Sequence, residues 1–239
     1  MSPPPLRPDG TEIVYGRNPV RELIAAGSRP IYEIAVLAQL AGEPWLERTP
    51  VVTRTRDELG RMSGTSDHQG VVAVTDPYPY SEIGDLLARP GPVVCLDGAQ
   101  DPRNLGAIAR VAEGAGAAGI VIPTRGSPGV TATVAKASAG AVEHLAIARV
   151  GSMVAFLHDA RGGGRTAIGA EPEGGEDYRA LAWPRDVILV MGSEGEGLRP
   201  RVREACDRLA RIPMAGSVAS LNISIASAIL LFETLRTPN

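Results

Sequence analysis

The stretch Leu189-Val-Met-Gly-Ser-Glu-Gly-Glu-Gly-Leu198 decides the fold of this chain, together with Ile212-Pro-Met-Ala-Gly-Ser-Val-Ala-Ser-Leu-Asn222. Each stretch begins with apolar residues typical of a buried strand and continues into glycines and other small residues typical of a loop. In α/β proteins, ligands bind at the carboxyl ends of the strands, and glycines there let backbone N–H groups approach closely. The pattern therefore predicts a site for a small polar ligand at these two loops.

Strands and helices alternate around these stretches, which favours an α/β fold with a mostly parallel sheet covered on both faces. In the C-terminal part we expect strands at residues 93–96, 120–122, 145–150, 165–169, 187–191 and 211–214. The expected helices span residues 104–115, 131–140, 153–160, 199–209 and 222–235. The last of these helices is apolar around most of its circumference, so we expect it to be buried on more than one side.

A smaller α/β unit is expected ahead of this domain. Its first helix is predicted to have Asn18 as N-cap and Pro19 as first residue, and to stop at Gly27. Strands at 31–37, 51–55 and 70–75 and a short helix at 57–62 follow, up to a turn-rich sequence at 76–80. The predicted division is a disordered tail at 1–10, an N-terminal domain at 11–76, a linker at 77–91 and a C-terminal domain at 92–239.

The composition limits the class of protein. The chain has 239 residues, of which 44% are hydrophobic, and a net charge of −3. That charge argues only weakly against a nucleic-acid partner, because binding needs no more than a local basic surface. The two cysteines lack metal-ligand spacing, so no metal site or disulfide framework is expected. No stretch is apolar enough to span a membrane and the N-terminus has no signal core, so we expect a cytoplasmic protein.

The glycines of Glu113-Gly-Ala-Gly-Ala-Ala-Gly119 match the GxGxxG pattern of dinucleotide-binding proteins. That fingerprint requires a strand before the glycines and a helix after them. Here the expected order is reversed, with the helix 104–115 first and the strand 120–122 second. The glycines are better interpreted as a helix stop, and the order disfavours an NAD-dependent α/β enzyme.

A polar segment also follows the apolar strand at 93–96, in Leu96-Asp-Gly-Ala-Gln-Asp-Pro-Arg-Asn-Leu-Gly-Ala-Ile-Ala-Arg110. Asn104 is expected to cap the next helix. Gly106 and Arg110 are four residues apart and share a helix face, which leaves room for a substrate beside a cation. The alternative is a structural cap with a solvated arginine. His68 is interpreted as stabilising a turn, with contact to RNA as the alternative, and His144 as structural rather than catalytic.

In this order, the segments Asp101–Arg110, Met191–Leu198 and Ile212–Asn222 resemble the three motifs of the SpoU/TrmH-type 2′-O-ribose RNA methyltransferases of the SPOUT superfamily. The N-terminal part resembles the ribosomal-protein-like RNA-binding domain that precedes the catalytic domain in many members. With Tyr15-Gly-Arg-Asn-Pro19 and His68-Gln-Gly70, the chain is most similar to the subgroup that methylates a guanosine ribose in 23S rRNA.

The resemblance implies a C-terminal trefoil knot whose loops bind S-adenosylmethionine, and a homodimer in which two subunits complete each active site. The residues that it assigns to the cofactor are Gly192, Ile212, Met214 and Leu221. Those that it assigns to the catalytic and RNA-facing group are Asn104, Arg110, Glu194, Ser220 and Asn222. One departure is the short connection at 38–50, where Gly42 and Pro44 disfavour a full helix; it bears on substrate choice more than on chemistry.

Direct methyl transfer to a ribose 2′-oxygen needs positioning and no protein nucleophile. Arg110 is the activating residue that the family leads us to expect. Arginine is a poor base because it keeps its proton in proteins, so we interpret Arg110 as electrostatic support for the developing alkoxide or for a substrate phosphate. The arginines expected to contact RNA phosphates are Arg17, Arg54, Arg56, Arg103 and Arg125. The alternatives are a tRNA or antibiotic-resistance rRNA methyltransferase, and a catalytically silent RNA-binding ribosome-assembly protein.

Overall fold

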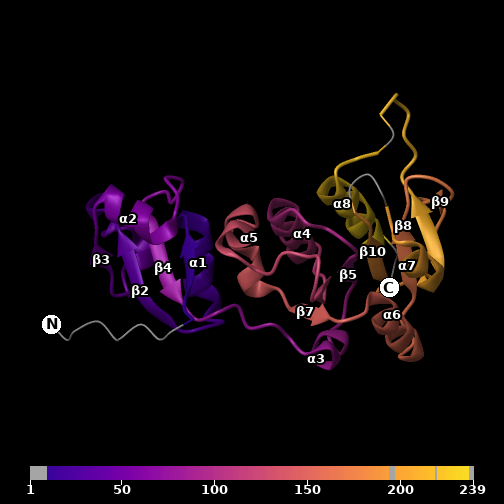
Figure 1. Cartoon of the computed structure of the whole chain (residues 1–239), viewed down its shortest axis with the longest axis horizontal. Coiled ribbons are helices and arrows are strands. Elements are labelled where there is room, and N and C mark those ends of the chain that lie inside the picture. Colours follow the sequence, from indigo (N-terminus) through magenta and orange to yellow (C-terminus); the bar gives the residue numbers. More distant parts are fainter. Residues whose placement is uncertain (1–9, 194–196, 219, 237–239) are drawn as a thin grey trace. The chain divides into compact units, whose positions relative to one another are not determined.

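The computed structural model describes residues 10–193, 197–218 and 220–236 (Figure 1). The chain forms two compact units. The first unit consists of the chain up to Pro79 together with the later segment Gly129–His144, and the second consists of the remainder. Both units combine helices with a sheet, so the predicted α/β class is confirmed.

The first unit is built on a four-stranded sheet in the order β1-β4-β2-β3. β4 is antiparallel to β1 and β2, whereas β3 is parallel to β2. The strands are β1 (Glu12–Tyr15), β2 (Ile31–Val36), β3 (Val52–Thr53) and β4 (Val71–Thr75). The helices are α1 (Arg17–Ala26) and α2 (Arg56–Ser63), and two 3₁₀ turns, η1 (Ala38–Leu40) and η2 (Pro44–Leu46), replace a full helix as expected. All residues of β4 are buried, so both faces of the sheet are covered.

The start of α1 differs from the prediction. Gly16, not Asn18, precedes the first helical residue, and its φ of 100° favours glycine. The backbone N–H of Arg17 is satisfied from outside the helix, by Gln69 Oε1 at 3.1 Å. The predicted Asn18 cap is therefore wrong, whereas the predicted stop at Gly27 is confirmed by the left-handed conformation of that residue.

The segment Gly129–His144 carries α5 (Ala132–Ala137) and the 3₁₀ turn η3 (Ala141–His144). Thr131 caps α5 by accepting the backbone N–H of Val134 at 3.4 Å. We expected these residues in a continuous C-terminal domain at 92–239. In the structure they pack with the first unit instead.

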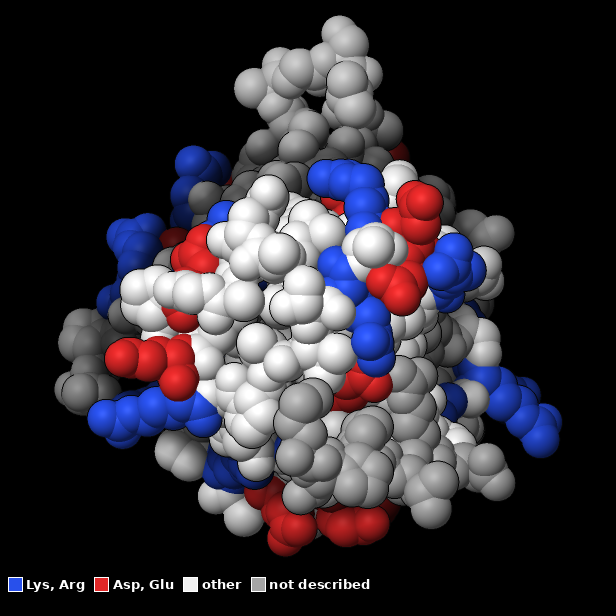
Figure 2. Space-filling view, turned by 90° about the vertical axis from the view of Figure 1, so that its left-hand side faces the viewer, with Lys and Arg blue, Asp and Glu red and all other residues white. Residues whose placement is uncertain are grey.

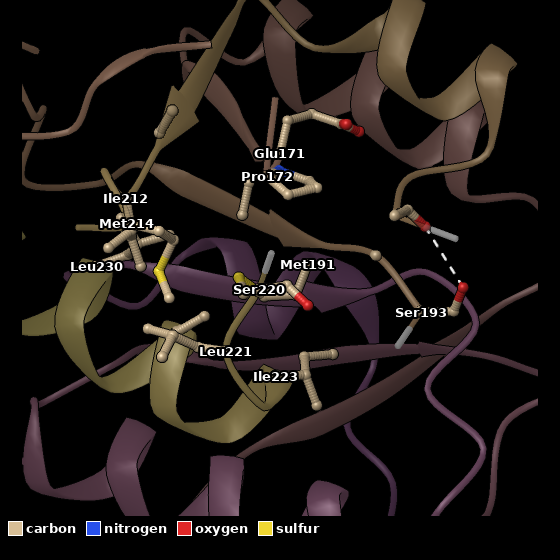
Figure 3. Close-up of a pocket in the computed structure, with 15 residues that line it drawn as sticks. Glu171, Pro172, Met191, Ser193, Ile212, Met214, Ser220, Leu221, Ile223 and Leu230 are labelled. Atoms are coloured by element: carbon tan, nitrogen blue, oxygen red, sulfur yellow. Dashed lines mark hydrogen bonds between the residues drawn. The ribbon is translucent and has the colours of Figure 1, made fainter. Parts of the chain in front are cut away.

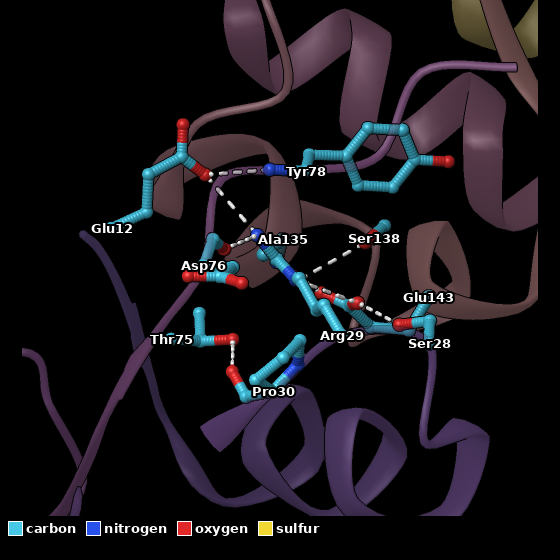
Figure 4. A network of polar contacts seen from close by, with 10 residues as sticks. All are labelled: Glu12, Ser28, Arg29, Pro30, Thr75, Asp76, Tyr78, Ala135, Ser138 and Glu143. Carbon is cyan, nitrogen blue, oxygen red and sulfur yellow. Dashed lines mark hydrogen bonds and ion pairs between the residues drawn. The ribbon is translucent and has the colours of Figure 1, made fainter. Parts of the chain in front are cut away.

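A buried ion pair joins this segment to the N-terminal part of the first unit. The Arg29 side chain is 3% exposed and the Glu143 side chain is 0% exposed. Arg29 Nη2 donates to Glu143 Oε1 at 2.6 Å, and Arg29 Nη1 donates to Glu12 Oε2 at 3.1 Å (Figure 4). Ser28 Oγ donates to the other Glu143 oxygen at 3.0 Å. A buried carboxylate is stable only with such partners, so the segment and the N-terminal part depend on each other.

The second unit is built on a seven-stranded sheet in the order β7-β6-β5-β10-β8-β11-β9, and every neighbouring pair is parallel. The strands are β5 (Val93–Leu96), β6 (Gly119–Pro123), β7 (Ile147–Val150), β8 (Ala167–Ala170), β9 (Glu176–Asp177), β10 (Ile188–Met191) and β11 (Arg208–Arg211). The helices are α3 (Ile83–Leu87), α4 (Pro102–Gly114), α6 (Met153–Gly162), α7 (Pro200–Ala205) and α8 (Ile223–Thr234).

The chain between α7 and α8 differs from the prediction in a way that matters for the site. The helix was expected to reach residue 209 and the strand to span 211–214. Instead, the backbone N–H of Asp207 donates to the carbonyl of Ala167 at 2.9 Å, and this hydrogen bond draws the chain into the sheet beside β8. β11 therefore ends at Arg211, and Ile212 and Met214 lie beyond the carboxyl end of the strand.

The glycines at 114–119 lie between a helix and a strand, in the order predicted from the sequence. α4 ends at Gly114 and β6 begins at Gly119, so the helix precedes the glycines and the strand follows them. This order is the reverse of the dinucleotide fingerprint. Across the described ranges, no helix is long and apolar enough to cross a membrane.

We expect Glu143→Gln to lower the free energy of unfolding of the first unit by about 3 kcal/mol, because the buried Arg29 guanidinium loses its counter-charge. Urea denaturation of the full chain checks this, followed by the fluorescence of Trp45 in a Trp183→Phe background. Arg21→Gln removes the more exposed pair with Glu22 and should change the free energy by less than about 0.5 kcal/mol. Equal, small effects in the two variants would show that the buried pair is not needed.

Candidate active site

A pocket opens where β8, β10 and β11 end and α8 begins (Figure 3). About 720 Å³ of space lies within it, part of which is open to solvent. Apolar side chains form most of its wall: Met191, Ile212, Met214, Leu221, Ile223 and Leu230. Glu171, Ser193 and Ser220 bring polar groups to it. This lining suits a ligand with a flat apolar part and a polar or charged part.

The four residues predicted to hold the cofactor all line this pocket: Gly192, Ile212, Met214 and Leu221. They reach it from two loops, one after β10 and one after β11. At Gly192 the close approach requires glycine, because a Cβ there would lie 2.1 Å from the carbonyl carbon of Gly197. Ser193 and Gly197 exchange backbone hydrogen bonds of 3.0 and 3.2 Å beside this contact, so the chain returns close to the end of β10.

A second, more polar pocket adjoins the first and shares Ser193 and Ile223 with it. Asn104 lines this second pocket from the first turn of α4. Asn222 Nδ2 donates to Asn104 Oδ1 at 3.1 Å. The structure therefore brings together two predicted site residues that come from motifs far apart in the sequence.

Different residues cap the two helices that carry these asparagines. Asp101 caps α4, since its Oδ1 accepts the backbone N–H of Arg103 at 2.8 Å. The predicted cap role of Asn104 is therefore wrong, and its amide is turned toward Asn222 instead. Asn222 does cap α8, where its Oδ1 accepts the backbone N–H of Ser224 at 2.9 Å.

The remaining predicted catalytic residues have different placements. Ser220 lines the first pocket. Arg110 is exposed on α4, about 9 Å further along the helix axis than Asn104, and lines neither pocket. Glu194 lies outside the described residues.

The arginines predicted to contact RNA fall into two groups. Arg17 forms an ion pair with Glu43, and Arg54 Nη2 lies 3.2 Å from Glu33 Oε1. Arg56, Arg103 and Arg125 are exposed. Figure 2 shows basic and acidic side chains interspersed around a broad neutral area, without a continuous basic patch on that face. A phosphate that binds Arg17 or Arg54 would therefore approach a cation that already has a carboxylate beside it.

The predicted structural role of His68 fits its surroundings. The side chain is fully buried, and Nδ1 accepts the backbone N–H of Gly70 at 3.1 Å, which holds the turn into β4. His144 pairs with Glu22, with 3.0 Å between His144 Nε2 and Glu22 Oε2. Over the described part of the chain, no group of His, Cys, Asp and Glu side chains is arranged to hold a metal ion.

Two carboxylates hold the chain just after Gly197. The fully buried Asp97 follows β5 and accepts from Arg199 Nε at 2.7 Å and from the Arg199 backbone N–H at 3.1 Å. This hydrogen bonding raises the pKa of the Arg199 guanidinium. Glu171 follows β8, and its Oε1 accepts the backbone N–H of Leu198 at 3.2 Å. Consecutive backbone N–H groups are thus held from the ends of β5 and β8, the two strands that flank β10.

Asp97, Glu171 and Arg199 were not among the residues predicted for the site. A signal for two of them exists in the sequence, because Asp97 and Glu171 are acidic residues that directly follow apolar strands. Their partners could not be read from the sequence, since the contacts depend on the order of β5, β10 and β8 in the sheet.

We expect Asp97→Asn to lower the free energy of unfolding of the second unit by about 2 kcal/mol, because hydrogen bonds to a buried charged group are lost or become donor-to-donor contacts. Urea denaturation followed by Trp183 fluorescence in a Trp45→Phe background checks this. Glu176→Gln provides the matched control, since it alters a carboxylate–arginine pair that is half exposed. That control should lose less than about 0.5 kcal/mol, and a similar loss in both variants would argue against the anchoring role of Asp97.

Comparison with known proteins agrees with this arrangement. Residues 91–232 match the SpoU rRNA methylase family, and residues 13–81 match the RNA 2′-O ribose methyltransferase substrate-binding domain. A putative TrmH family tRNA/rRNA methyltransferase of Bacillus subtilis, YacO, is 42% identical over 190 residues, which make up 77% of this chain and 76% of the relative.

Two solved structures with bound S-adenosylmethionine (AdoMet) have the same fold. The SpoU methyltransferase AviRb from Streptomyces viridochromogenes aligns with a TM-score of 0.81 and 26% identity, covering 95% of this chain and 90% of that one. An rRNA methyltransferase from Sinorhizobium meliloti aligns with a TM-score of 0.80 and 28% identity, covering 95% and 87%. With the pocket formed by the predicted cofactor residues, these matches show that the chain belongs to the SpoU/TrmH family of S-adenosylmethionine-dependent RNA methyltransferases.

Proposed function

We propose that this enzyme methylates a ribose 2′-hydroxyl of RNA, and that its target is a guanosine in 23S rRNA. The observation that carries the proposal is the pair of adjoining pockets. Gly192, Ile212, Met214 and Leu221 line one of them, and Asn104 lines the other, in contact with Asn222. A methyl donor in the first pocket and a ribose in the second would lie side by side, as direct transfer requires.

The first pocket suits S-adenosylmethionine by its own chemistry. Ile212, Met214 and Leu230 offer an apolar wall for an adenine ring. The close approach at Gly192 leaves backbone groups facing the pocket without an intervening side chain. We propose that Gly192, Ile212, Met214 and Leu221 hold the cofactor largely through their backbone.

Bound S-adenosylmethionine supplies an activated methyl group. We propose that the amides of Asn104 and Asn222 orient the ribose hydroxyl, with Ser220 beside them and Glu194 as a further member of the group. Arg110 keeps its proton and acts electrostatically, either on the developing alkoxide or on a phosphate that accepts the proton. Most of the rate enhancement would then come from alignment and from charge placed where it develops.

The position of Arg110 supports a homodimeric enzyme. Arg110 is exposed and lines neither pocket of its own chain, so we propose that it serves the site of a partner subunit. α8 and its C-cap Leu235 also expose apolar side chains at helical spacing: Ile225, Phe232 and Leu235 are 53%, 50% and 53% exposed. An apolar face of this kind favours a subunit interface.

The proposed substrate and fold details rest on the family. The substrate-binding match at 13–81 and the likeness to an rRNA methyltransferase over most of both chains favour rRNA over tRNA. The trefoil knot expected from the resemblance is supported by the way the chain on both sides of β11 returns to one pocket. An RNA substrate also favours a cytoplasmic location.

We expect Arg110→Ala to reduce turnover by at least about a hundredfold while leaving cofactor affinity within about twofold, since removal of an electrostatic group at a reacting centre costs about 3 kcal/mol or more. Arg110→Lys should also reduce turnover, because lysine lacks the planar guanidinium group, which can donate two hydrogen bonds side by side. Single-turnover kinetics and calorimetry with S-adenosylmethionine measure the two effects. Arg103→Ala, on the same helix, should mainly raise KM for RNA. Loss of cofactor binding in Arg110→Ala would reject the proposed role.

Phe232→Glu should convert the dimer to a monomer and abolish methyl transfer, because a charge would be buried in the proposed interface. Sedimentation equilibrium at several protein concentrations measures the mass. Arg89→Glu changes charge at an exposed position away from α8 and should leave the mass unchanged. A wild-type protein that sediments as a monomer at micromolar concentration would rule out the proposed dimer.

The proposed function is tested by methyl transfer from labelled S-adenosylmethionine to total RNA from cells that lack the protein, followed by nucleoside mass spectrometry. We expect 2′-O-methylguanosine in 23S rRNA. Labelled tRNA, or a different 2′-O-methyl nucleoside, would support the proposed reaction and contradict the proposed target. Absence of transfer to both free RNA and ribosomal particles would favour the alternative of a silent RNA-binding protein.

A further inference from the structure

We propose that Glu171 recognises the positive charge of the cofactor, and that it combines this with its role as an anchor of the chain after Gly197. The inference concerns the cofactor that the family uses and does not depend on the identity of the RNA target. It rests on where the carboxylate lies, how its two oxygens are used and which other charges line the pocket.

Glu171 is brought to the pocket by the end of β8. The strand ends at Ala170, and the backbone N–H of Glu171 still donates to the carbonyl of Ala210 at 2.9 Å, which fixes the residue to the sheet. Pro172 follows and restricts the backbone of Glu171 to an extended conformation. Figure 3 shows Glu171 and Pro172 on the side of the pocket opposite Leu221 and Ile223. The side chain is therefore held at a defined place on the wall.

The two oxygens of Glu171 have different surroundings. Oε1 accepts the backbone N–H of Leu198 at 3.2 Å. Both oxygens lie 3.5 Å from the position that a Cβ on Gly197 would occupy, so both face this glycine. No described residue donates a hydrogen bond to Oε2. Among the described residues, the Leu198 N–H is thus the one hydrogen-bond donor to this carboxylate, whose two oxygens offer about four acceptor sites.

Charge complementarity points to a cation as the ligand that this carboxylate recognises. Among the described residues that line the pocket, Glu171 is the one charged side chain, and it lies among apolar groups. S-Adenosylmethionine carries a sulfonium and an α-ammonium group against one carboxylate, so its net charge is positive. A half-buried carboxylate beside an apolar wall interacts with a cation more strongly than a fully solvated one does. If the adenine ring packs against the apolar wall of Ile212, Met214 and Leu230, the charged methionyl part of the cofactor lies on the Glu171 side of the pocket.

Isosteric substitution separates the two roles of this residue. Glu171→Gln keeps an oxygen that can accept the Leu198 N–H but removes the negative charge. Glu171→Ala removes both. Glu173→Gln, at an exposed position that does not line the pocket, removes one charge from the same segment and serves as the control.

Three ligands separate the possible contacts on the cofactor. S-Adenosylmethionine has the ammonium and the sulfonium, S-adenosylhomocysteine has the ammonium alone, and 5′-methylthioadenosine has neither but keeps the ribose hydroxyls. Titration calorimetry with the full chain, in the absence of RNA, gives the dissociation constants. Because no methyl transfer is measured, a failure here is distinct from a wrong RNA target.

We expect Glu171→Gln to raise the dissociation constant of S-adenosylmethionine about tenfold, equivalent to about 1.4 kcal/mol. The dissociation constant of 5′-methylthioadenosine should change by less than twofold. S-Adenosylhomocysteine identifies the cation: a tenfold loss assigns the ammonium and an unchanged affinity assigns the sulfonium. Glu171→Ala should bind S-adenosylmethionine more weakly still, and Glu173→Gln should bind it as tightly as the unmodified protein does. A parallel loss for 5′-methylthioadenosine would overturn the proposal in favour of a ribose contact. Unchanged binding of S-adenosylmethionine to Glu171→Gln would reject the role of Glu171 in cofactor recognition and leave only its hydrogen bond to the Leu198 N–H.

Discussion

The approach of Gly192 to Gly197 is the contact on which the site depends. The absence of a side chain at Gly192 lets the chain leave β10 and return against its own start. Asp97 and Glu171 then hold the next two backbone N–H groups from the ends of β5 and β8. The geometry of the pocket wall is thus set by backbone contacts and by carboxylates on rigid strands, which positions a ligand better than mobile side chains would.

The proposed catalytic group is likewise built from a small number of elements. Asn104 lies in the first turn of α4 and Asn222 is the N-cap of α8, and the two amides meet at 3.1 Å beside the pocket. Asp101 takes over the capping of α4, so Asn104 can face Asn222. Arg110 lies on the exposed side of the same helix. One helix therefore presents groups both to the pocket of its own chain and to the outside, which suits an enzyme whose sites are shared between subunits.

The sequence indicated most of the fold, because glycines, apolar runs and helix stops are local signals. The alternation of strands and helices predicted the parallel sheet, and the two glycine-rich or small-residue loops predicted the pocket-lining residues. What failed depended on contacts distant in the sequence. Asn18 is no cap because α1 already begins at Arg17, whose backbone N–H is bound by Gln69. β11 begins at Arg208, directly after the hydrogen bond from Asp207 to Ala167. Asp97 and Glu171 can be recognised in the sequence as acidic residues that follow apolar strands. Their hydrogen-bond partners cannot, because these depend on the order of the strands in the sheet.

The placement of residues 129–144 has a consequence for how members of this family can be recombined. This segment lies between β6 and β7 in the sequence, yet it packs with the N-terminal unit and shares the buried pair of Arg29 and Glu143. A substrate-binding module cut at the apparent boundary near Pro79 would leave half of that pair behind. Chimeras that exchange target specificity between relatives would have to move two separate stretches of sequence together, and natural divergence of either stretch is constrained by the other.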